Sequence, residues 1–251
     1  MTEAVLTERW VGSACRLQLN RPDKGNALSR ELVQALDEAI QRCTERGASL
    51  LVIEGAGRHF CTGFDLSGIA EETDDSLLAR FTRIELMLQR LARAPFCTVA
   101  LAQGRVMGAG ADIFAACAVR LVQGEASFAF PGASGFGLVL GSRRLAALVG
   151  PAMALRLITT GCTLGTADAV AAGLVTEQLA DAASAGAAVD AAAARSADTA
   201  LYRQLQAATQ GDAAHDDARD LELLVRSAAR PGLQARVAAY LERSAAARKK
   251  P

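Results

Sequence analysis

Apolar segments of two kinds divide the first half of the chain into predicted strands. Residues 11–20 alternate between apolar and polar positions, a pattern typical of a strand with one buried face. Residues 50–53 read Leu-Leu-Val-Ile, and such a continuous run predicts a strand covered on both faces, as in parallel sheets. Residues 97–102 have the same character, and short strands are expected at 121–122 and 127–130.

Helical spacing of apolar residues fills the segments between these strands. Ser29 is placed to cap a helix whose apolar positions run from Leu32 to Cys43. A second stripe spans residues 77–91, and the alanine-rich stretch 180–200 also predicts a helix, because alanine is the best helix former. Strand, glycine loop and helix follow one another at least twice, so we expect an α/β layered core.

Composition narrows the functional classes. The 251 residues are 51% hydrophobic, and 27 basic residues balance 27 acidic ones, so the chain lacks the positive field of a nucleic-acid binder. No apolar run reaches the length of about 18 residues that a membrane span requires. Six scattered cysteines and two histidines fit no disulfide framework or metal site. Without a targeting segment at its start, the chain is predicted to be a cytoplasmic protein.

Two glycine loops are the most informative chemical features. Gly63-Phe64-Asp65 and Gly108-Ala109-Gly110 are each expected to open a helix, where backbone N–H groups lack partners. Glycine lets a ligand approach such a backbone closely. Two N–H groups that converge on one oxygen form an oxyanion hole. The alternative, that both loops are only tight connections in a packed domain, stays open at this point.

Other short motifs support a function only weakly. The glycine pairs at 55–57 and 108–110 lack the third glycine of a dinucleotide-binding fingerprint. Ser134 is not in a nucleophile elbow, and its possible bases, His59 and His215, are distant in sequence. A nicotinamide oxidoreductase and a serine hydrolase are therefore poor alternatives.

Four longer segments resemble the enoyl-CoA hydratase/isomerase (crotonase) superfamily, in the order in which that family has them. Residues 20–28 (NRPDKGNAL) are similar to its N-terminal signature, and residues 60–66 (FCTGFDL) to its first oxyanion-hole loop. Residues 103–112 (QGRVMGAGAD) are similar to the second loop, and residues 163–175, which end in AGLV, to a later structural motif. The resemblance covers roughly residues 10–245.

The resemblance implies an α/β fold, a crotonase-like spiral of repeated strand-strand-helix units with a helical C-terminal part. We expect residues 1–195 to form the core and residues 196–251 a C-terminal helical trimerisation region. The implied assembly is a homotrimer or homohexamer that acts on acyl-CoA in fatty acid metabolism. Coenzyme A enters as part of the substrate, with no separate cofactor, metal, nucleic acid or membrane partner.

The resemblance also assigns site residues. The backbone amides of Phe64 and Ala109 are implied as the oxyanion hole. Asp112 falls at one of two positions where family hydratases have a catalytic glutamate, and Gly132 falls at the other. The remaining predicted contacts with substrate or coenzyme A are Lys24, Asn26, Ala27, Leu28, Thr62, Gly63, Asp65, Leu66, Gly108 and Gly110, together with Gly132 itself.

The sequence thus predicts an enzyme, a lyase or isomerase that stabilises a thioester enolate between two amides. Because Gly132 has no side chain to transfer a proton, hydration by two carboxyl groups is in doubt. Isomerisation and hydrolysis remain alternatives. So does a subunit that binds acyl-CoA or assembles with others without catalysis.

Overall fold

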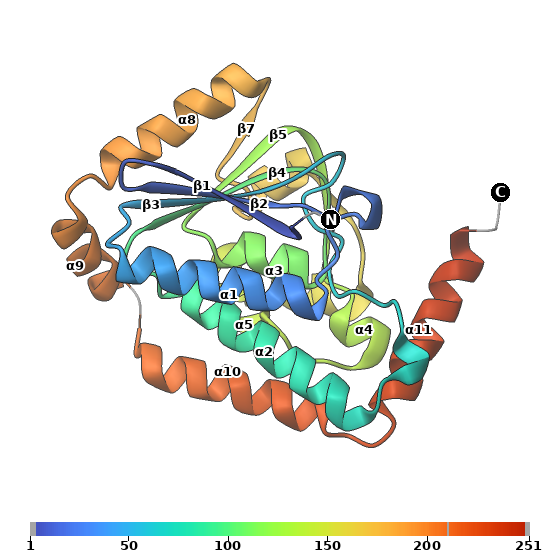
Figure 1. Ribbon diagram of the computed structural model, residues 1–251. Coiled ribbons are helices and arrows are strands. Elements are labelled where there is room, and N and C mark those ends of the chain that lie inside the picture. The colour runs from blue at the N-terminus through green and yellow to red at the C-terminus, as the bar shows by residue number, and fades with distance from the viewer. Residues whose placement is uncertain (1–3, 210, 249–251) are drawn as a thin grey trace.

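The computed structural model describes residues 4–209 and 211–248, which form one sheet with helices on both faces (Figure 1). The sheet has seven strands in the order β1-β2-β3-β4-β5-β6, and β7 pairs with β5 off this path. Its strands are β1 (Leu6–Val11), β2 (Ala14–Leu19), β3 (Leu50–Gly55), β4 (Cys97–Met107), β5 (Val119–Ala129), β6 (Leu164–Gly165) and β7 (Glu177–Leu179).

The central strands run parallel, and helices connect them. β2, β3, β4 and β5 pair in parallel, whereas β1 pairs with β2, and β6 with β5, in antiparallel fashion. The connecting helices are α1 (Arg30–Glu45), α2 (Asp74–Ala92) and α3 (Ala109–Ala116), with the 3₁₀ turns η1 (Pro22–Lys24) and η2 (Ile69–Glu71). Ser29 caps α1 as predicted, because its side chain accepts a hydrogen bond from Leu32 N at 3.2 Å.

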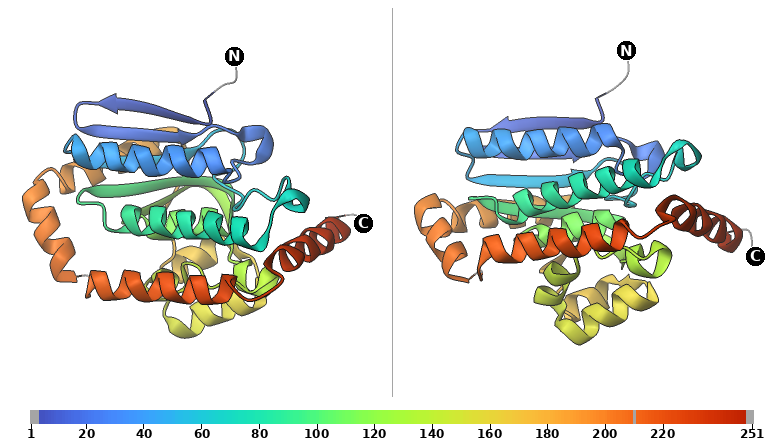
Figure 2. Two further views of the ribbon diagram at one scale, coloured as in Figure 1. Left: turned by 60° about the horizontal axis from the view of Figure 1, so that its bottom comes forward. Right: turned by 90° about the horizontal axis from the view of Figure 1, so that it is seen from below.

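The second half of the chain is largely helical, as expected. It contains α4 (Gly132–Phe136), α5 (Ser142–Val149), α6 (Pro151–Thr160), α7 (Thr166–Ala171), α8 (Ala182–Arg195), α9 (Thr199–Thr209), α10 (Ala213–Ala228) and α11 (Leu233–Arg248). Helix α10 lies along α2 (Figure 2), where Gln89 Nε2 donates to Asp217 O at 2.8 Å. The predicted boundary after residue 195 falls at the end of α8, and the trimerisation role of the residues beyond it stays a prediction.

Both faces of the sheet are covered, and β3 shows why its sequence is continuously apolar. Leu51 and Ile53 face the larger core beneath α1, α2 and α3. Leu50 and Val52 face a smaller core on the side of α8. Since successive side chains of a strand point to opposite faces, four apolar residues in a row are needed to fill both cores.

Two predicted strand boundaries were wrong, and both involve glycine. The strand expected at residues 97–102 continues as β4 to Met107, and the two short strands expected at 121–122 and 127–130 are one strand, β5. Gly104 and Gly124 adopt positive φ angles of 62° and 69°. A register shift lies between Ala102 and Gly104. Glycine therefore bends these strands without ending them.

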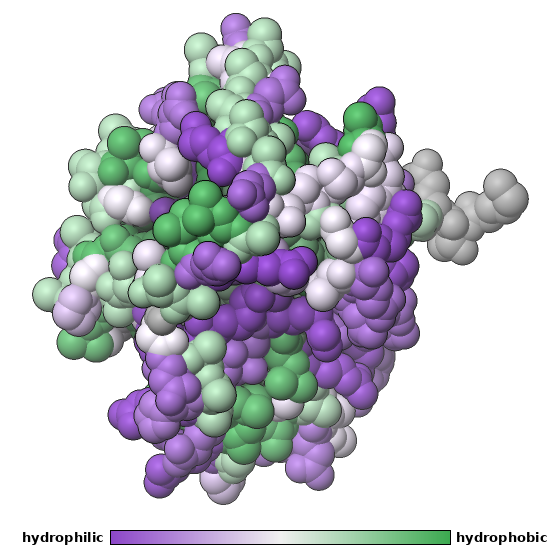
Figure 3. Space-filling view, turned by 90° about the vertical axis from the view of Figure 1, so that its left-hand side faces the viewer, coloured by the Kyte–Doolittle hydropathy of each residue, from purple (hydrophilic) through white to green (hydrophobic). Residues whose placement is uncertain are grey.

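Surface composition is mixed on the side of the molecule that carries α9. Figure 3 shows hydrophobic and hydrophilic side chains interspersed on this face. The exposed apolar residues of α9 are Leu201 and Leu205, which are 51% and 55% exposed. No helix within the described residues is long and apolar enough to cross a membrane.

Candidate active site

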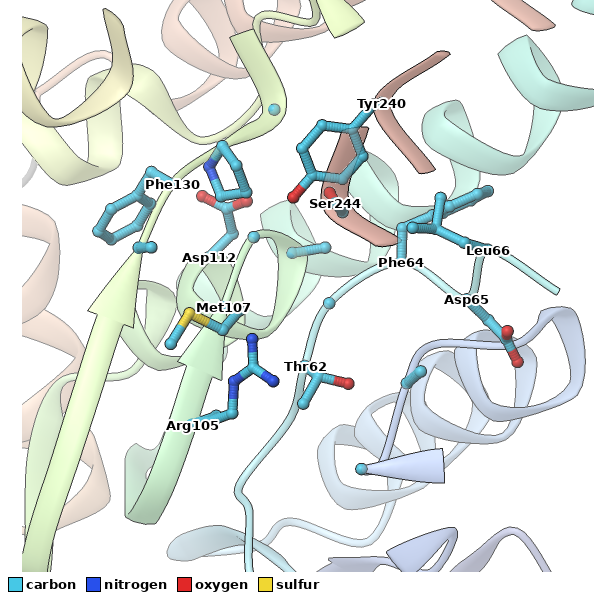
Figure 4. Close-up of a pocket in the computed structure, with 18 of the residues that line it drawn as sticks. Thr62, Phe64, Asp65, Leu66, Arg105, Met107, Asp112, Phe130, Tyr240 and Ser244 are labelled. Carbon is cyan, nitrogen blue, oxygen red and sulfur yellow. The ribbon is translucent and has the colours of Figure 1, made fainter. Parts of the chain in front are cut away.

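A cleft of about 970 Å³ opens where the carboxyl ends of β3 and β4 meet α4 and α11. Its lining includes the segment around η1, the loop after β3, the end of β4 with the start of α3, the end of β5 with the start of α4, and α11. Single residues of α2 and α6 and the loops after α4 and α6 complete it. In a largely parallel α/β sheet, ligands bind outside the carboxyl ends of the strands. This cleft is therefore the candidate active site (Figure 4).

The first glycine loop is held by the backbone of the segment that precedes α1. Leu28 N donates to Gly63 O at 2.8 Å, and Asp65 N donates to Leu28 O at 3.2 Å. These two bonds flank Phe64 and use its neighbours on both sides. The Asp65 carboxylate pairs with Arg21 at 2.8 Å and accepts from Ser67 Oγ at 2.7 Å, so Asp65 orders the loop.

The second glycine loop passes directly from strand to helix. Gly108 N donates to Ala129 O at 2.8 Å, and Gly108 O accepts from Asp112 N at 3.0 Å. Gly108 has φ 51° and ψ −129°, a conformation that favours glycine, and Ala109 is the first residue of α3. The Ala109 N–H therefore lies among the unpaired donors at a helix N-terminus, where the helix dipole is positive.

The two loops lie against each other. A Cβ atom added to Gly63, whose φ is 93°, would lie 2.7 Å from Met107 O and 3.5 Å from Ala109 N. Only glycine allows this approach. Both Phe64 and Ala109 line the cleft. Neither of their N–H groups donates a hydrogen bond to any other group within residues 4–209 and 211–248.

The expectation that both loops open a helix was wrong for the first loop. After Phe64 the chain forms an isolated bridge with Leu28, and η2 begins only at Ile69. A helix dipole therefore acts on the second N–H group alone. The first is oriented by the backbone bonds of Leu28.

Asp112 brings one carboxyl group to the cleft from the first turn of α3. Its side chain is 6% exposed, and burial raises the pKa of the carboxyl to about 8, against a smaller lowering by the charge of Arg144. Gly141, at the start of α5, has no room for a Cβ atom because the Asp112 carboxyl occupies that space. The Asp112 carboxyl is therefore mostly neutral at pH 7 and can donate a proton.

A buried ion pair lies behind Asp112. Arg144 Nη2 is 2.5 Å from Glu85 Oε2, with both side chains almost fully buried. The pair leaves Arg144 Nε buried and, among the described residues, without a hydrogen-bond partner. Arg144 pairs with Glu85 and with Asp220, and among the described residues it forms no salt bridge with Asp112, whose carboxyl lines the cleft.

Gly132 lines the cleft at the start of α4 and leaves space in front of it. A Cβ atom on Gly132 would have Leu138 O, 3.9 Å away, as its nearest neighbour. The backbone conformation of Gly132 is not among those with positive φ. The second carboxyl position of the predicted pair therefore has room for a side chain but has none.

Helix α11 supplies a wall that was not predicted. Tyr240 and Ser244 line the cleft, and Figure 4 shows their hydroxyl groups on the same side as the Asp112 carboxyl. They occur more than a hundred residues after both glycine loops. The signal available in the sequence was their four-residue spacing on one face of the last helix, but periodicity does not show what that face contacts.

Three cationic side chains line the cleft, and Figure 4 shows one of them, Arg105, at the end away from Tyr240. The three are Lys24, Arg58 and Arg105, and within the described residues none of them forms a salt bridge. His59 lies beside them and accepts a hydrogen bond from Arg105 N at 3.2 Å. Its pKa is lowered by burial and by the charges of Arg105 and Arg58. This end is suited to an anionic group.

The structure brings most of the predicted site residues to one cleft. Those that line it are Lys24, Ala27, Thr62, Gly63, Phe64, Asp65, Leu66, Gly108, Ala109, Asp112 and Gly132. Three others do not line it and have structural contacts instead. Asn26 is buried and donates to Ala56 O and His59 O at 2.9 and 2.8 Å. Leu28 is fully buried, and Gly110 packs against Cys61, where a Cβ atom would clash.

A metal site has no support in the part of the chain that the structure describes, where no group of three or more His, Cys, Asp or Glu side chains is placed to hold an ion. The cysteines are all free thiols there, and five of the six are buried.

Comparison with protein families gives a match over nearly the whole chain. The family model for enoyl-CoA hydratase/isomerase matches residues 14–248. A Mycobacterium bovis protein named "Probable enoyl-CoA hydratase echA6" is 35% identical over 151 residues, 59% of this chain and 56% of that protein. The ethylmalonyl-CoA decarboxylase of Mus musculus is 34% identical over 168 residues, 65% of this chain and 52% of that protein. These matches thus span only about half of each relative.

Solved structures align with a larger share of both chains than these sequence matches do. A Bordetella parapertussis protein named as an enoyl-CoA hydratase/isomerase has a TM-score of 0.91 and 39% identity, covering 99% of this chain and all of that one. The enoyl-CoA hydratase of Bacillus halodurans has a TM-score of 0.82 at 19% identity, covering 94% of this chain and 99% of that one, which shows a shared fold only.

Proposed function

Because this chain belongs to the enoyl-CoA hydratase/isomerase family, we propose that it is an acyl-CoA-processing enzyme that stabilises a thioester enolate with two backbone amides. The observation that carries the proposal is the pair of adjacent, unbonded N–H groups of Phe64 and Ala109 in one cleft. An enolate oxygen is more negative than the ground-state carbonyl oxygen, so fixed donors stabilise the transition state selectively.

Coenzyme A fits the cationic end of the cleft. Its phosphates need positive charge, and Lys24, Arg58 and Arg105 provide it without competition from a carboxylate partner in the described structure. The acyl group then extends past the glycine loops toward Asp112 and α11. This orientation places the thioester carbonyl beside Phe64 and Ala109.

Asp112 is the proton-transfer side chain in this proposal. Its raised pKa, about 8, keeps both protonation states accessible near neutral pH, as general acid–base catalysis requires. Gly132 contributes no second carboxyl group. Hydration, which in family hydratases uses two carboxyl groups, is therefore expected to be slow, and reactions that need one proton-transfer group are favoured.

Decarboxylation of a 2-carboxyacyl-CoA is the second candidate. It is favoured by the neutral Asp112 carboxyl and by the similarity to proteins named ethylmalonyl-CoA decarboxylase. The bond between Cα and the carboxylate would break, CO₂ would leave, and the electron pair would form the enolate. The Asp112 carboxyl would then give its proton to Cα and regain one from water.

The test of the proposal measures enolate formation directly. Butanoyl-CoA is incubated with the protein in D₂O, and deuterium at Cα is followed by mass spectrometry. We expect exchange with the wild type and, with Phe64→Pro, a rate lower by about 10²- to 10³-fold, because proline lacks the N–H group. Phe64→Leu keeps the N–H group and is the matched control.

Two outcomes contradict the proposal. One is full exchange by a folded Phe64→Pro protein. The other is binding of butanoyl-CoA with no exchange and no turnover of 3-enoyl-CoA, crotonyl-CoA or ethylmalonyl-CoA, a result that identifies a non-catalytic acyl-CoA-binding subunit instead.

A further inference from the structure

The acyl end of the cleft contains three oxygen-bearing groups without hydrogen-bond partners among the described residues. They are the Asp112 carboxyl, the Tyr240 hydroxyl and the Ser244 hydroxyl, which Figure 4 shows on one side of the cleft. In the described part of the chain, none of the three side chains forms a hydrogen bond, although the surrounding residues are extensively bonded. The proton transfer proposed above uses only the first of them.

The fold fixes the position of α11. Asp74 on α2 accepts hydrogen bonds from Gly232 N at 2.7 Å and from Gln234 N at 2.8 Å, at the start of this helix. Leu233 and Val237 are fully buried in the larger core. Tyr240 and Ser244 continue the same helical face beyond the core, so they reach the cleft by the same packing that holds the helix.

The Tyr240 ring packs against two neighbouring residues of α4, Gly135 and Phe136. It packs edge-on against Phe136, with ring centroids 5.3 Å apart and an interplanar angle of 76°. It also lies close to Gly135, where an added Cβ atom would be 2.8 Å from the ring. Arg243 Nη2 ties the next turn of α11 to Gly135 O at 2.9 Å. The Tyr240 hydroxyl therefore points to a defined place in the cleft.

The remaining wall at this end is apolar. Phe64 stacks on Phe81 with centroids 4.4 Å apart, and Phe81 lies 5.9 Å from Phe136. A hydrocarbon acyl chain would pack well against this apolar wall. It would also cover the hydroxyl groups of Tyr240 and Ser244 and the Asp112 carboxyl, and leave them without hydrogen-bond partners. A site with such groups discriminates against ligands that cannot hydrogen-bond to them.

We propose that Tyr240 is a specificity-determining residue whose hydroxyl hydrogen-bonds an oxygen substituent of the acyl group, with Ser244 beside it. The substrate class is then an acyl-CoA that carries a hydroxyl or carboxylate group close to the thioester. This inference rests on the proposed function only in taking the cleft as an acyl-CoA site. It requires binding and does not depend on the reaction.

The experiment measures affinities by calorimetry for three ligands of four acyl carbons: butanoyl-CoA, 3-hydroxybutanoyl-CoA and succinyl-CoA. With the wild type, at least one oxygenated ligand should bind about tenfold more tightly than butanoyl-CoA, as one net hydrogen bond allows. Tyr240→Phe keeps the ring and its packing. It should abolish this preference and bind butanoyl-CoA at least as tightly as the wild type does, because no Tyr240 hydroxyl is then covered without a partner.

Tyr202→Phe is the matched control, because Tyr202 is the other tyrosine of the chain and packs in the smaller core, away from the cleft. It should keep the wild-type preference. Equal wild-type affinities for all three ligands overturn the inference, as does a preference that survives Tyr240→Phe. A loss of affinity for all ligands alike in Tyr240→Phe overturns it too, since that reflects packing. If no acyl-CoA binds the wild type, the proposed function fails as well.

Discussion

The two halves of the cleft present different kinds of chemical group. The half formed by the glycine loops presents backbone N–H groups, which hydrogen bonds of Leu28, Gly63 and Gly108 hold in place. The half formed by α3, α4 and α11 presents side chains, and there one carboxyl position is filled by Asp112 and the other is empty at Gly132. Backbone donors are retained wherever the fold is retained, whereas side chains change by single substitutions. In the proposed function, the first half therefore stabilises the enolate and the second half selects the particular reaction.

The largest expected effect comes from the backbone half. Ala109→Pro removes the second N–H group at the first position of α3, where proline is well tolerated. The rate of deuterium exchange into butanoyl-CoA should fall by about 10²- to 10³-fold. Ala109→Ser keeps the N–H group and should retain most of the rate. If the Ala109→Pro protein is folded and exchanges deuterium at the wild-type rate, the Ala109 N–H group does not stabilise the enolate.

A smaller effect is expected from the one carboxyl group in the side-chain half. Asp112→Asn should lower the exchange rate by about a hundredfold, because the amide cannot accept the α-proton. Burial raises the Asp112 pKa to about 8, and the base form exists above that value. The wild-type rate should therefore rise with pH up to about 8 and then level off.

The pH profile itself checks this assignment. Asp112→Asn should lose the rise between pH 6 and 8, whereas Asp168→Asn, a substitution on α7 outside the cleft, should keep it. A rise that persists unchanged in Asp112→Asn would assign the titration to another group.

A carboxyl group introduced at Gly132 tests whether the side-chain half of the cleft determines the reaction. Gly132→Glu adds a carboxyl-bearing side chain where a Cβ atom would meet no atom closer than Leu138 O at 3.9 Å, and the φ of Gly132 is not positive. Hydration of crotonyl-CoA, followed by the loss of its ultraviolet absorbance, should increase about tenfold or more as a second proton-transfer group is added. Gly132→Gln has a similar shape without the acid and should give no gain. Equal rates in both variants would show that the missing carboxyl group does not limit hydration.

The smallest expected effect is on stability. A buried carboxyl whose pKa is raised binds its proton in the folded protein between about pH 4 and 8, while the unfolded chain releases it, so folding stability falls as pH rises through this range. Asp112→Asn removes this penalty. Its melting temperature should exceed that of the wild type by a few degrees at pH 8 and by less at pH 5. The same difference at both pH values would contradict the raised pKa.

The sequence was most informative about the backbone half. Glycines at 63 and 108 and the flanking motif segments identified both loops, because positive φ angles and close backbone approach require glycine and are thus visible in the sequence. The α/β layering was predicted from strands, glycine loops and helices that follow one another, whereas the crotonase-like spiral was predicted only from the family resemblance. The bends at Gly104 and Gly124 were misread, since glycine marks a bulged strand as readily as a loop.

The side-chain half of the cleft was harder to predict from the sequence. Asp112 and Gly132 were predicted as site residues and line the cleft, but the raised pKa of Asp112 depends on burial against Gly141 and α5, which is tertiary packing. The contribution of Tyr240 depends on how α11 docks against α4, through contacts such as Arg236 Nε to Phe136 O at 3.0 Å. Contacts between residues a hundred positions apart leave no local pattern, and for this reason α11 could not be placed.

The most direct test of the central claim is the infrared spectrum of a bound acyl-CoA with ¹³C in its thioester carbonyl. Two N–H donors on the carbonyl oxygen weaken the C=O bond, so the band should move to lower frequency on binding to the wild type, and less far in Ala109→Pro. A bound ligand whose carbonyl band stays at its position in water, or shifts equally in both proteins, would contradict the account.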